Sequence, residues 1–207
     1  NLFLFPYDWR DDIDTLGNDL DEFIEARFVS GQKVDIIAHS MGGLVAKKYI
    51  QDFGPERFSK VIFVGTPHLG SPKAAKRLIF GDPMIQFVPV LNYLEIKKIA
   101  RNMPSVNTLL PNQEYFNQYP GYLKTSGELL DYSETKSLLA SLDLNAGLIQ
   151  QAEDFYRTGI NDLDLSNLEA YNINGCTEAT LSSFEVDPTF IRLPISPKFV
   201  PGDGTVP

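Results

Sequence analysis

The chain has 207 residues, of which 43% are hydrophobic and 22% are charged, so a disordered, collagen-like or coiled-coil protein is excluded. Its 18 Lys and Arg residues against 27 Asp and Glu residues give a net charge of −9, and an acidic chain without basic clusters argues against nucleic acid as a partner. The single cysteine excludes an intrachain disulfide, and we interpret Cys176 as an unreactive buried thiol.

Both ends of the chain indicate a fragment of a larger domain. Asn1 opens a strand-like apolar run without the basic leader or cleavage site of a signal peptide, and Pro207 ends the chain inside a Gly-rich motif. No apolar run approaches the roughly 20 residues that span a bilayer. The compartment stays open, because a chain without disulfides suits the cytosol and a leader before Asn1 would allow export.

Strands and helices are expected to alternate over the first 65 residues. Short apolar runs predict buried strands, and apolar residues with a 3.6-residue period predict amphipathic helices. This order favours an α/β fold with a mostly parallel sheet flanked by helices. The expected elements are a strand over 2–7, a helix over 11–30, a strand over 34–38, a helix over 42–53 and a strand over 61–64.

The alternation stops after residue 65, and strand patterning returns only at 168–173, with a helix expected over 137–156. About a hundred residues are far more than an ordinary connection between sheet strands. We therefore expect a first part of the core over 1–69, an inserted cap over 70–165 and a second part of the core over 166–207.

The strongest chemical signal is Ser40, which lies between the second expected strand and the second expected helix. Ala38 and Gly42 are small enough for a sharp turn, although the G-x-S-x-G pattern usually begins with glycine. Such a nucleophile elbow lifts the serine hydroxyl above the sheet and points the helix N-terminus at a developing oxyanion, to which the Met41 N–H would donate. The alternative is a serine that only caps the helix.

A serine nucleophile needs a base, and the chain has two histidines. His39 neighbours Ser40 and points to the opposite side of the strand, so we interpret it as a packed or partly buried histidine. His68 follows the third expected strand, but the order serine, acid, histidine that this fold uses disfavours it as the base. Asp203 lies after the last expected strand and is the candidate acid, with a plain turn-forming role as the alternative.

Five motifs occur along the chain in a fixed order. Together they resemble the lecithin:cholesterol acyltransferase family of α/β-hydrolases, which includes lysosomal phospholipases and phospholipid:diacylglycerol acyltransferases. The motifs are Phe5-Pro6-Tyr7-Asp8-Trp9-Arg10, Ala38-His39-Ser40-Met41-Gly42-Gly43, Gly65-Thr66-Pro67-His68-Leu69-Gly70-Ser71-Pro72, Pro104-Ser105-Val106 with Leu109-Leu110-Pro111, and Gly202-Asp203-Gly204-Thr205-Val206-Pro207.

The resemblance implies an α/β-hydrolase fold with Ser40 as nucleophile, Asp203 as the acid of the triad and a cap over the site. It also implies that His68 belongs to a structural loop. The second oxyanion donor would precede Asn1, and the catalytic histidine would follow Pro207, so the chain alone is expected to be inactive and poorly stable.

Two further segments allow two interpretations each. In Tyr7-Asp8-Trp9-Arg10 the side chains either wall an acyl pocket or form an Asp–Arg pair with Trp9 supporting the loop. For an apolar stretch in the expected cap, the first interpretation is lipid contact, either with a lipid chain or transiently with a lipid surface. The second is packing within the cap. The stretch contains Phe80, Met84, Ile85, Phe87, Val88, Val90 and Leu91.

These features predict a serine esterase of the lipase or phospholipase kind, or an O-acyltransferase, that forms an acyl-enzyme on Ser40. No cofactor is expected, and the sequence has no metal-binding loop of the D-x-[DN]-x-[DN]-G type. Two alternatives stay open: a non-catalytic binding protein with the same fold, and a serine peptidase or amidase.

Overall fold

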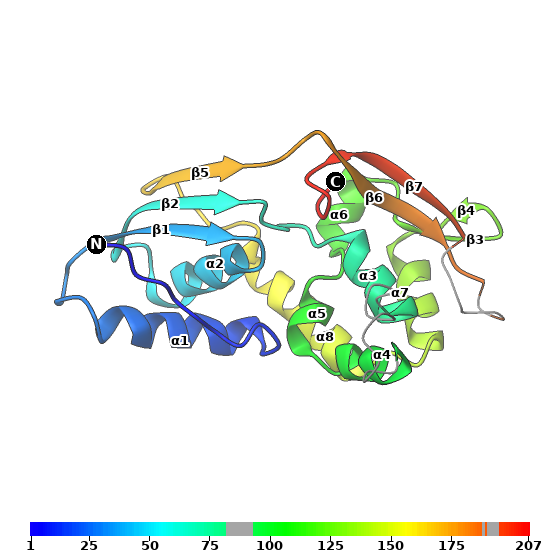
Figure 1. The fold of residues 1–207 in the computed structure, drawn as a ribbon, viewed down its shortest axis with the longest axis horizontal. Helices are drawn as coiled ribbons and strands as arrows, with labels where there is room; N and C mark the ends of the chain where they lie inside the picture. Colours follow the sequence, from blue (N-terminus) through cyan, green and yellow to red (C-terminus); the bar gives the residue numbers. More distant parts are fainter. Residues whose placement is uncertain (82–92, 188, 190–194) are drawn as a thin grey trace.

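The structure is a computed structural model that describes residues 1–81, 93–187, 189 and 195–207. Its first sheet has three parallel strands in the order β1–β2–β5. Because the strands are parallel, their carboxyl ends lie along one edge, which faces the second part of the molecule and the C-terminus (Figure 1). The strands are β1 (Val34–His39), β2 (Phe58–Val64) and β5 (Glu169–Ile173).

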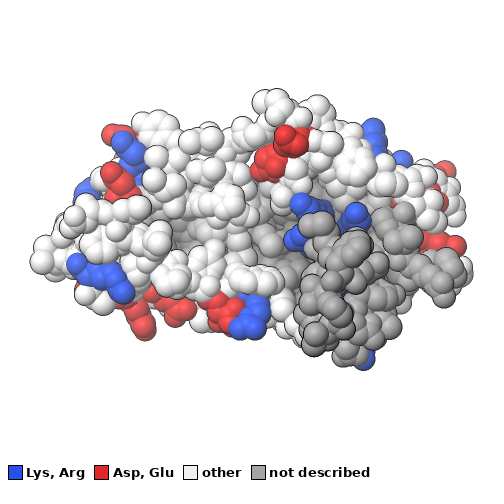
Figure 2. All heavy atoms as spheres, in the orientation of Figure 1, with Lys and Arg blue, Asp and Glu red and all other residues white. Residues whose placement is uncertain are grey.

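Two helices cover one face of this sheet. They are α1 (Ile13–Glu25) and α2 (Gly42–Phe53), and their apolar sides form the first core cluster with the inward residues of β1 and β2. Asp12 caps α1 by accepting a hydrogen bond from the Thr15 N–H at 2.7 Å. The outer side of α1 is rich in acidic side chains, which line the lower edge of the molecule (Figure 2).

The expected strand over residues 2–7 is wrong, since these residues lie in an extended segment outside both sheets. The segment packs on α1 through aromatic contacts. Phe5 meets the ring of Phe23, and Phe3 meets that of Phe28, each with 5.1 Å between ring centroids. These ring contacts take the place of the expected pairing in the sheet, while Leu2, Phe3 and Leu4 stay exposed.

A second sheet, which the sequence patterns did not predict, has the strand order β4–β3–β6–β7. Its long hairpin of β6 and β7 is antiparallel and ends one residue before Asp203, while β3 pairs with β6 in parallel. The strands are β3 (Leu123–Thr125), β4 (Glu128–Leu129), β6 (Glu178–Glu185) and β7 (Ile195–Gly202).

The remaining described helices lie on one side of the second sheet (Figure 1). The single helix expected over 137–156 is two helices, because Asp143 adopts a left-handed φ of 57° and Asn145 caps a new helix at the Leu148 N–H. The helices are α3 (Pro72–Phe80), α4 (Tyr93–Arg101), α5 (Pro104–Thr108), α6 (Gln113–Gln118), α7 (Tyr132–Ser141), α8 (Ala146–Phe155) and the π-helical turn η2 (Tyr156–Ile160).

A second core cluster joins these helices to the second sheet. Phe80 of α3 is buried in it, edge-to-face with Phe184 of β6, so its side chain packs within the protein. The other members of the apolar stretch, from Met84 to Leu91, lie outside the described residues. The cap over 70–165 stays a prediction, and the cluster draws on residues from both sides of residue 165.

None of the helices in the described part of the chain is both long and apolar enough to cross a bilayer.

Candidate active site

Ser40 lies at a strained turn between β1 and α2. Its φ of 53° is in the left-handed region, which non-glycine residues adopt at a cost of about 1–3 kcal/mol and which clusters at functional sites. The Ser40 N–H donates to the Val64 carbonyl at 2.9 Å, so the residue extends the pairing of β1 with β2 by one position. The serine is half-buried at the carboxyl edge of the sheet.

The start of α2 leaves a backbone donor beside Ser40. The helix begins at Gly42 with Met41 in the capping position, and no side chain caps it, so a capping role for Ser40 is wrong. The N–H groups of Gly43 and Leu44 donate to the carbonyls of Ser40 and Met41 at 3.0 and 2.9 Å. Among the described residues, no backbone carbonyl accepts from the Met41 N–H, so this donor is available for an oxyanion.

Close packing around the turn explains its small residues. A Cβ at Gly43 would overlap the side chain of Thr66, and a Cβ at Gly42 would lie 3.4 Å from the Tyr7 hydroxyl oxygen. The two glycines therefore let the start of α2 approach the loop after β2 and the N-terminal segment. Thr66 and Tyr7 belong to motifs that the sequence shows, but their positions against this turn come only from the structure.

Asp203 lies at the same edge of the sheet. A Cβ at Gly65, directly after β2, would lie 2.9 Å from Asp203 Oδ2, and a Cβ at Gly175, just beyond β5, would lie 2.9 Å from Asp203 Cβ. Asp203 Oδ1 accepts from the N–H groups of Thr205 and Val206 at 2.8 and 2.7 Å. These two bonds fix the carboxylate and leave Oδ2 for another donor.

The loop that carries Asp203 is tied to the surrounding structure. The Gly204 N–H donates to Thr180 Oγ1 at 2.7 Å, and Lys73 Nζ donates to the Gly204 carbonyl at 3.0 Å. Asp203 also lines a cavity of about 210 Å³ with His68 and the rings of Tyr115 and Tyr119. The structure thus brings Ser40, which follows β1, and Asp203, which lies beside the ends of β2 and β5, to the same edge of the first sheet.

Neither histidine of this chain is placed as the base. His39 is exposed, on the side of β1 opposite to Ala38, so the expectation that it is packed or partly buried is wrong. His68 Nε2 is 3.0 Å from Asn172 Oδ1, and its Nδ1 is buried without a hydrogen-bond partner. Burial, and next the nearby charge of Lys47, lower the pKa of His68 below 6.5.

Lys47 of α2 is a buried cation that the sequence analysis missed. Its exposed fraction is 7%, and burial lowers its pKa to about 8, with the attraction of Asp162 opposing the shift. Its position in an amphipathic helix gave no signal, since burial of a lysine depends on residues that pack on it from elsewhere in the chain.

The two remaining expectations near the N-terminus and at the cysteine have mixed outcomes. Asp8 and Arg10 form the expected ion pair, which lowers the pKa of Asp8 to about 2, and Trp9 is 55% exposed. Cys176 is exposed, so the expectation of a buried thiol is wrong; it lies between β5 and β6, where the chain crosses from one sheet to the other.

The structure is that of an α/β protein, with a strained serine between a parallel strand and a helix and a carboxylate at the same sheet edge. The model of the family "Lecithin:cholesterol acyltransferase" matches residues 1–157. The chain therefore belongs to the lecithin:cholesterol acyltransferase family.

Individual proteins similar to the chain are longer than it. "Uncharacterized protein YJR098C" of Saccharomyces cerevisiae is 35% identical over 88 residues, which cover 41% of this chain and 13% of the yeast protein. The match to a solved structure, "The crystal structure of Tle4-Tli4 complex", covers 94% of this chain and 52% of that one, with 18% identity and a TM-score of 0.61. The chain thus spans about half of that structure's length.

The fold is that of the α/β-hydrolases, with a parallel sheet flanked by helices as expected. The structure of a Bacillus licheniformis lipase, BlEst2 in its mature form, is 16% identical over a match that covers 79% of this chain and 66% of the lipase chain, with a TM-score of 0.33.

Proposed function

We propose that the chain carries the nucleophile and the acid of a serine esterase or O-acyltransferase that acts on lipid carboxylic esters. The observation that carries the proposal is the strained backbone of Ser40 at the end of a parallel strand, on the edge of the sheet where Asp203 lies. Membership of a family named for a lipid acyltransferase supports the choice of substrate class.

In the proposed reaction, Ser40 Oγ attacks the ester carbonyl carbon while a base takes its proton. The Met41 N–H donates to the oxyanion, at the positive end of the α2 dipole. Collapse of this intermediate breaks the bond to the alcohol, which leaves with a proton, and the acyl group stays on Ser40. Water then releases a fatty acid, or a second alcohol takes the acyl group.

Asp203 is proposed to orient the base, which we expect to be an imidazole. Because Oδ1 already accepts two backbone hydrogen bonds, Oδ2 is the oxygen that would accept the imidazole N–H. His68 does not fit this role, since Asn172 holds one of its ring nitrogens and the other is buried.

Covalent labelling tests the nucleophile. An alkyl fluorophosphonate is incubated with the whole protein and with its Ser40→Ala variant, and modified peptides are identified by mass spectrometry. We expect one phosphonylated residue, Ser40, and no labelling of the variant. Ser137→Ala, at an exposed serine on α7, is the matched control and should label as the unmodified protein does. Labelling at another serine would refute the assignment, and no labelling would favour a non-catalytic protein.

A further inference from the structure

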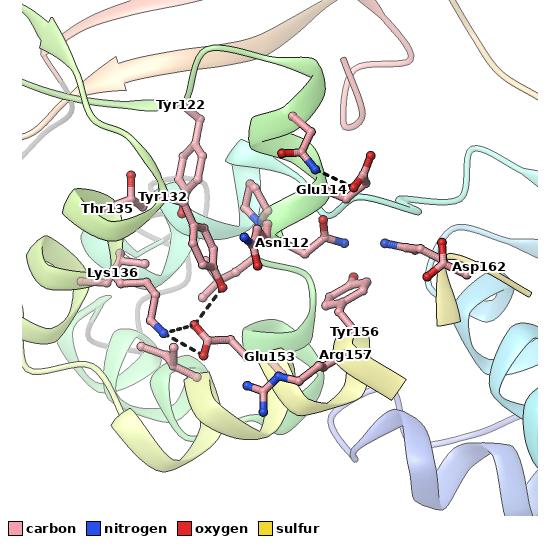
Figure 3. Close-up of a pocket in the computed structure, with 18 residues that line it drawn as sticks. Asn112, Glu114, Tyr122, Tyr132, Thr135, Lys136, Glu153, Tyr156, Arg157 and Asp162 are labelled. Carbon is pink, nitrogen blue, oxygen red and sulfur yellow. Dashed lines mark hydrogen bonds and ion pairs between the residues drawn. The ribbon is translucent and has the colours of Figure 1, made fainter. Parts of the chain in front are cut away.

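A cavity larger than the one beside Asp203 lies in the second part of the molecule. It has a volume of about 510 Å³, within the range of about 300–1,000 Å³ that small-molecule sites occupy, and it opens between α6, α7, α8 and η2. It shares no lining residue with the smaller cavity beside Asp203. We call it the tyrosine-lined cavity, after Tyr122, Tyr132 and Tyr156 in its wall (Figure 3).

Three polar atoms in the wall of this cavity are buried without a hydrogen-bond partner. They are Asn112 Nδ2, Thr135 Oγ1 and Asn161 Oδ1. Asn112 and Thr135 are 7% and 2% exposed, so both side chains are more than nine-tenths buried. Buried polar groups in proteins are nearly always paired, and three unpaired ones on a single cavity indicate that something else satisfies them.

The surrounding structure fixes the orientation of these groups. Asn112 caps α6, and its Oδ1 accepts from the Tyr115 N–H at 3.1 Å, so its amide nitrogen is the end left without a partner. Thr135 lies in the first turn of α7, where Asp131 and Glu134 form a capping box. The donors and acceptors of the cavity are therefore held in place before any ligand binds.

The tyrosine rings are held through their own hydroxyl groups. Tyr132 donates to Glu153 Oε1 at 3.0 Å, and Tyr156 donates to the Thr108 carbonyl at 2.9 Å (Figure 3 shows the first of these bonds). Because these hydroxyls are already engaged, the rings supply apolar surface to the cavity. The buried atoms left unpaired are one amide donor, one amide acceptor and one hydroxyl that does both.

The charges of the wall disfavour an anion. The wall contains two cations and three carboxylates, a net charge of −1. Lys136 pairs with Glu153 at 2.7 Å and Arg157 pairs with Asp154 at 3.0 Å, so neither cation is left for a phosphate or a carboxylate. In the described part of the chain, no cluster of three or more His, Cys, Asp or Glu side chains could hold a metal ion.

We propose that the tyrosine-lined cavity is a second ligand site, which binds a neutral polyhydroxylated ring such as a sugar or an inositol. Hydroxyl groups both donate and accept, as the Asn112, Thr135 and Asn161 atoms require together, and the faces of such a ring pack on aromatic side chains. The ring belongs either to a free molecule or to the uncharged head group of a lipid. This site does not depend on Ser40 as the nucleophile.

Two arms of a binding experiment on the whole protein separate these sources. In the first, methyl glucoside and myo-inositol are titrated by calorimetry. In the second, the protein is floated with phosphatidylcholine vesicles that contain or lack a neutral glucosyl lipid. Saturable binding of a free ring, or retention that needs the glucosyl lipid, supports the proposal if Ser40→Ala binds equally.

Matched variants locate the binding. Asn112→Asp keeps an oxygen to cap α6 and replaces the free donor by an acceptor, and Thr135→Val removes the hydroxyl at nearly constant shape; each should weaken binding at least about tenfold. Asn145→Asp, at the cap of α8 outside the cavity, and Thr125→Val on β3 are the controls and should bind normally.

Three results would overturn the proposal: no binding tighter than about 10 mM in either arm, binding that survives both cavity variants, or a crystal structure grown with these ligands in which water alone fills the cavity. Thermal melting of each variant shows that it is folded, and only folded variants are compared.

Discussion

The carboxyl edge of the first sheet and the tyrosine-lined cavity differ in how they hold polar groups. At the sheet edge, backbone geometry does the positioning: Ser40 is strained, and two backbone N–H groups fix Asp203. In the cavity, helix caps and ion pairs position side chains on short helices, and three polar atoms stay unpaired. The first arrangement suits a reaction at one atom, and the second suits recognition of a ligand with several hydroxyls.

The largest expected effect removes the carboxylate at the sheet edge. Asp203→Asn keeps Oδ1 as the acceptor for Thr205 and Val206 but loses the charge that stabilises an imidazolium, so ester turnover should fall by about 10⁴-fold. Steady-state assays with a p-nitrophenyl ester measure it. Asp187→Asn, at the opposite end of the β6–β7 hairpin, is the control and should keep full turnover. If Asp203→Asn remained active, Asp203 would be a turn former only.

The second prediction concerns Lys47, whose environment includes Asp162 of the cavity wall. Its pKa falls from 10.5 to about 8 on folding, so below pH 8 the folded protein carries a buried charge that costs at most about 3 kcal/mol. Lys47→Met should therefore be more stable than the wild type at pH 7, as measured by urea unfolding.

The pH dependence of stability gives a second test of the buried charge on Lys47. Between about pH 8 and 10.5 the unfolded chain binds the proton and the folded chain does not, so wild-type stability gains from Lys47 as pH rises, and the variant lacks this gain. Lys48→Met is the control. Lys48 is paired with Asp14 and Asp52 at 3.1 and 3.0 Å, so its replacement should not stabilise the protein. An unchanged stability of Lys47→Met at pH 7 would contradict the assigned burial.

The third prediction tests the packing of the serine turn. Gly43→Ala adds a Cβ that overlaps Thr66, so it should cost about 2 kcal/mol of stability and lower turnover as the start of α2 shifts. Gly147→Ala, at an exposed position in the first turn of α8, is the matched glycine change and should be neutral or stabilising by up to about 1 kcal/mol. Equal unfolding midpoints for both variants would show that the turn tolerates a larger residue.

The smallest effect concerns the support of the cavity. Asp131→Ala removes the capping box of α7 and should cost about 1 kcal/mol, seen as a drop of a few degrees in the melting temperature. Asp131→Asn keeps an acceptor for the Glu134 N–H and should recover most of the loss. A drop of the same size in both variants would mean that the cap does not stabilise α7.

The sequence by itself determined the local features of the first region. The helix over 42–53 was predicted to the residue, and the strand over 34–38 is one residue short of β1. Both depend on apolar periodicity and on glycines at their ends, which act over neighbouring residues. Ser40 and Asp203 were proposed in the same way, from small residues around a strand end and a Gly-rich turn, and the structure places both at one sheet edge.

Tertiary structure decided the rest. Residues 2–7 have the composition of a strand, but their aromatic rings pack on α1 instead. The second sheet pairs Leu123 with Phe184, and the tyrosine-lined cavity gathers residues from 110 to 162. Such contacts join residues far apart in the chain, so no local pattern shows them. Whether a polar group is paired or left unpaired in a cavity is settled only when these distant segments pack together.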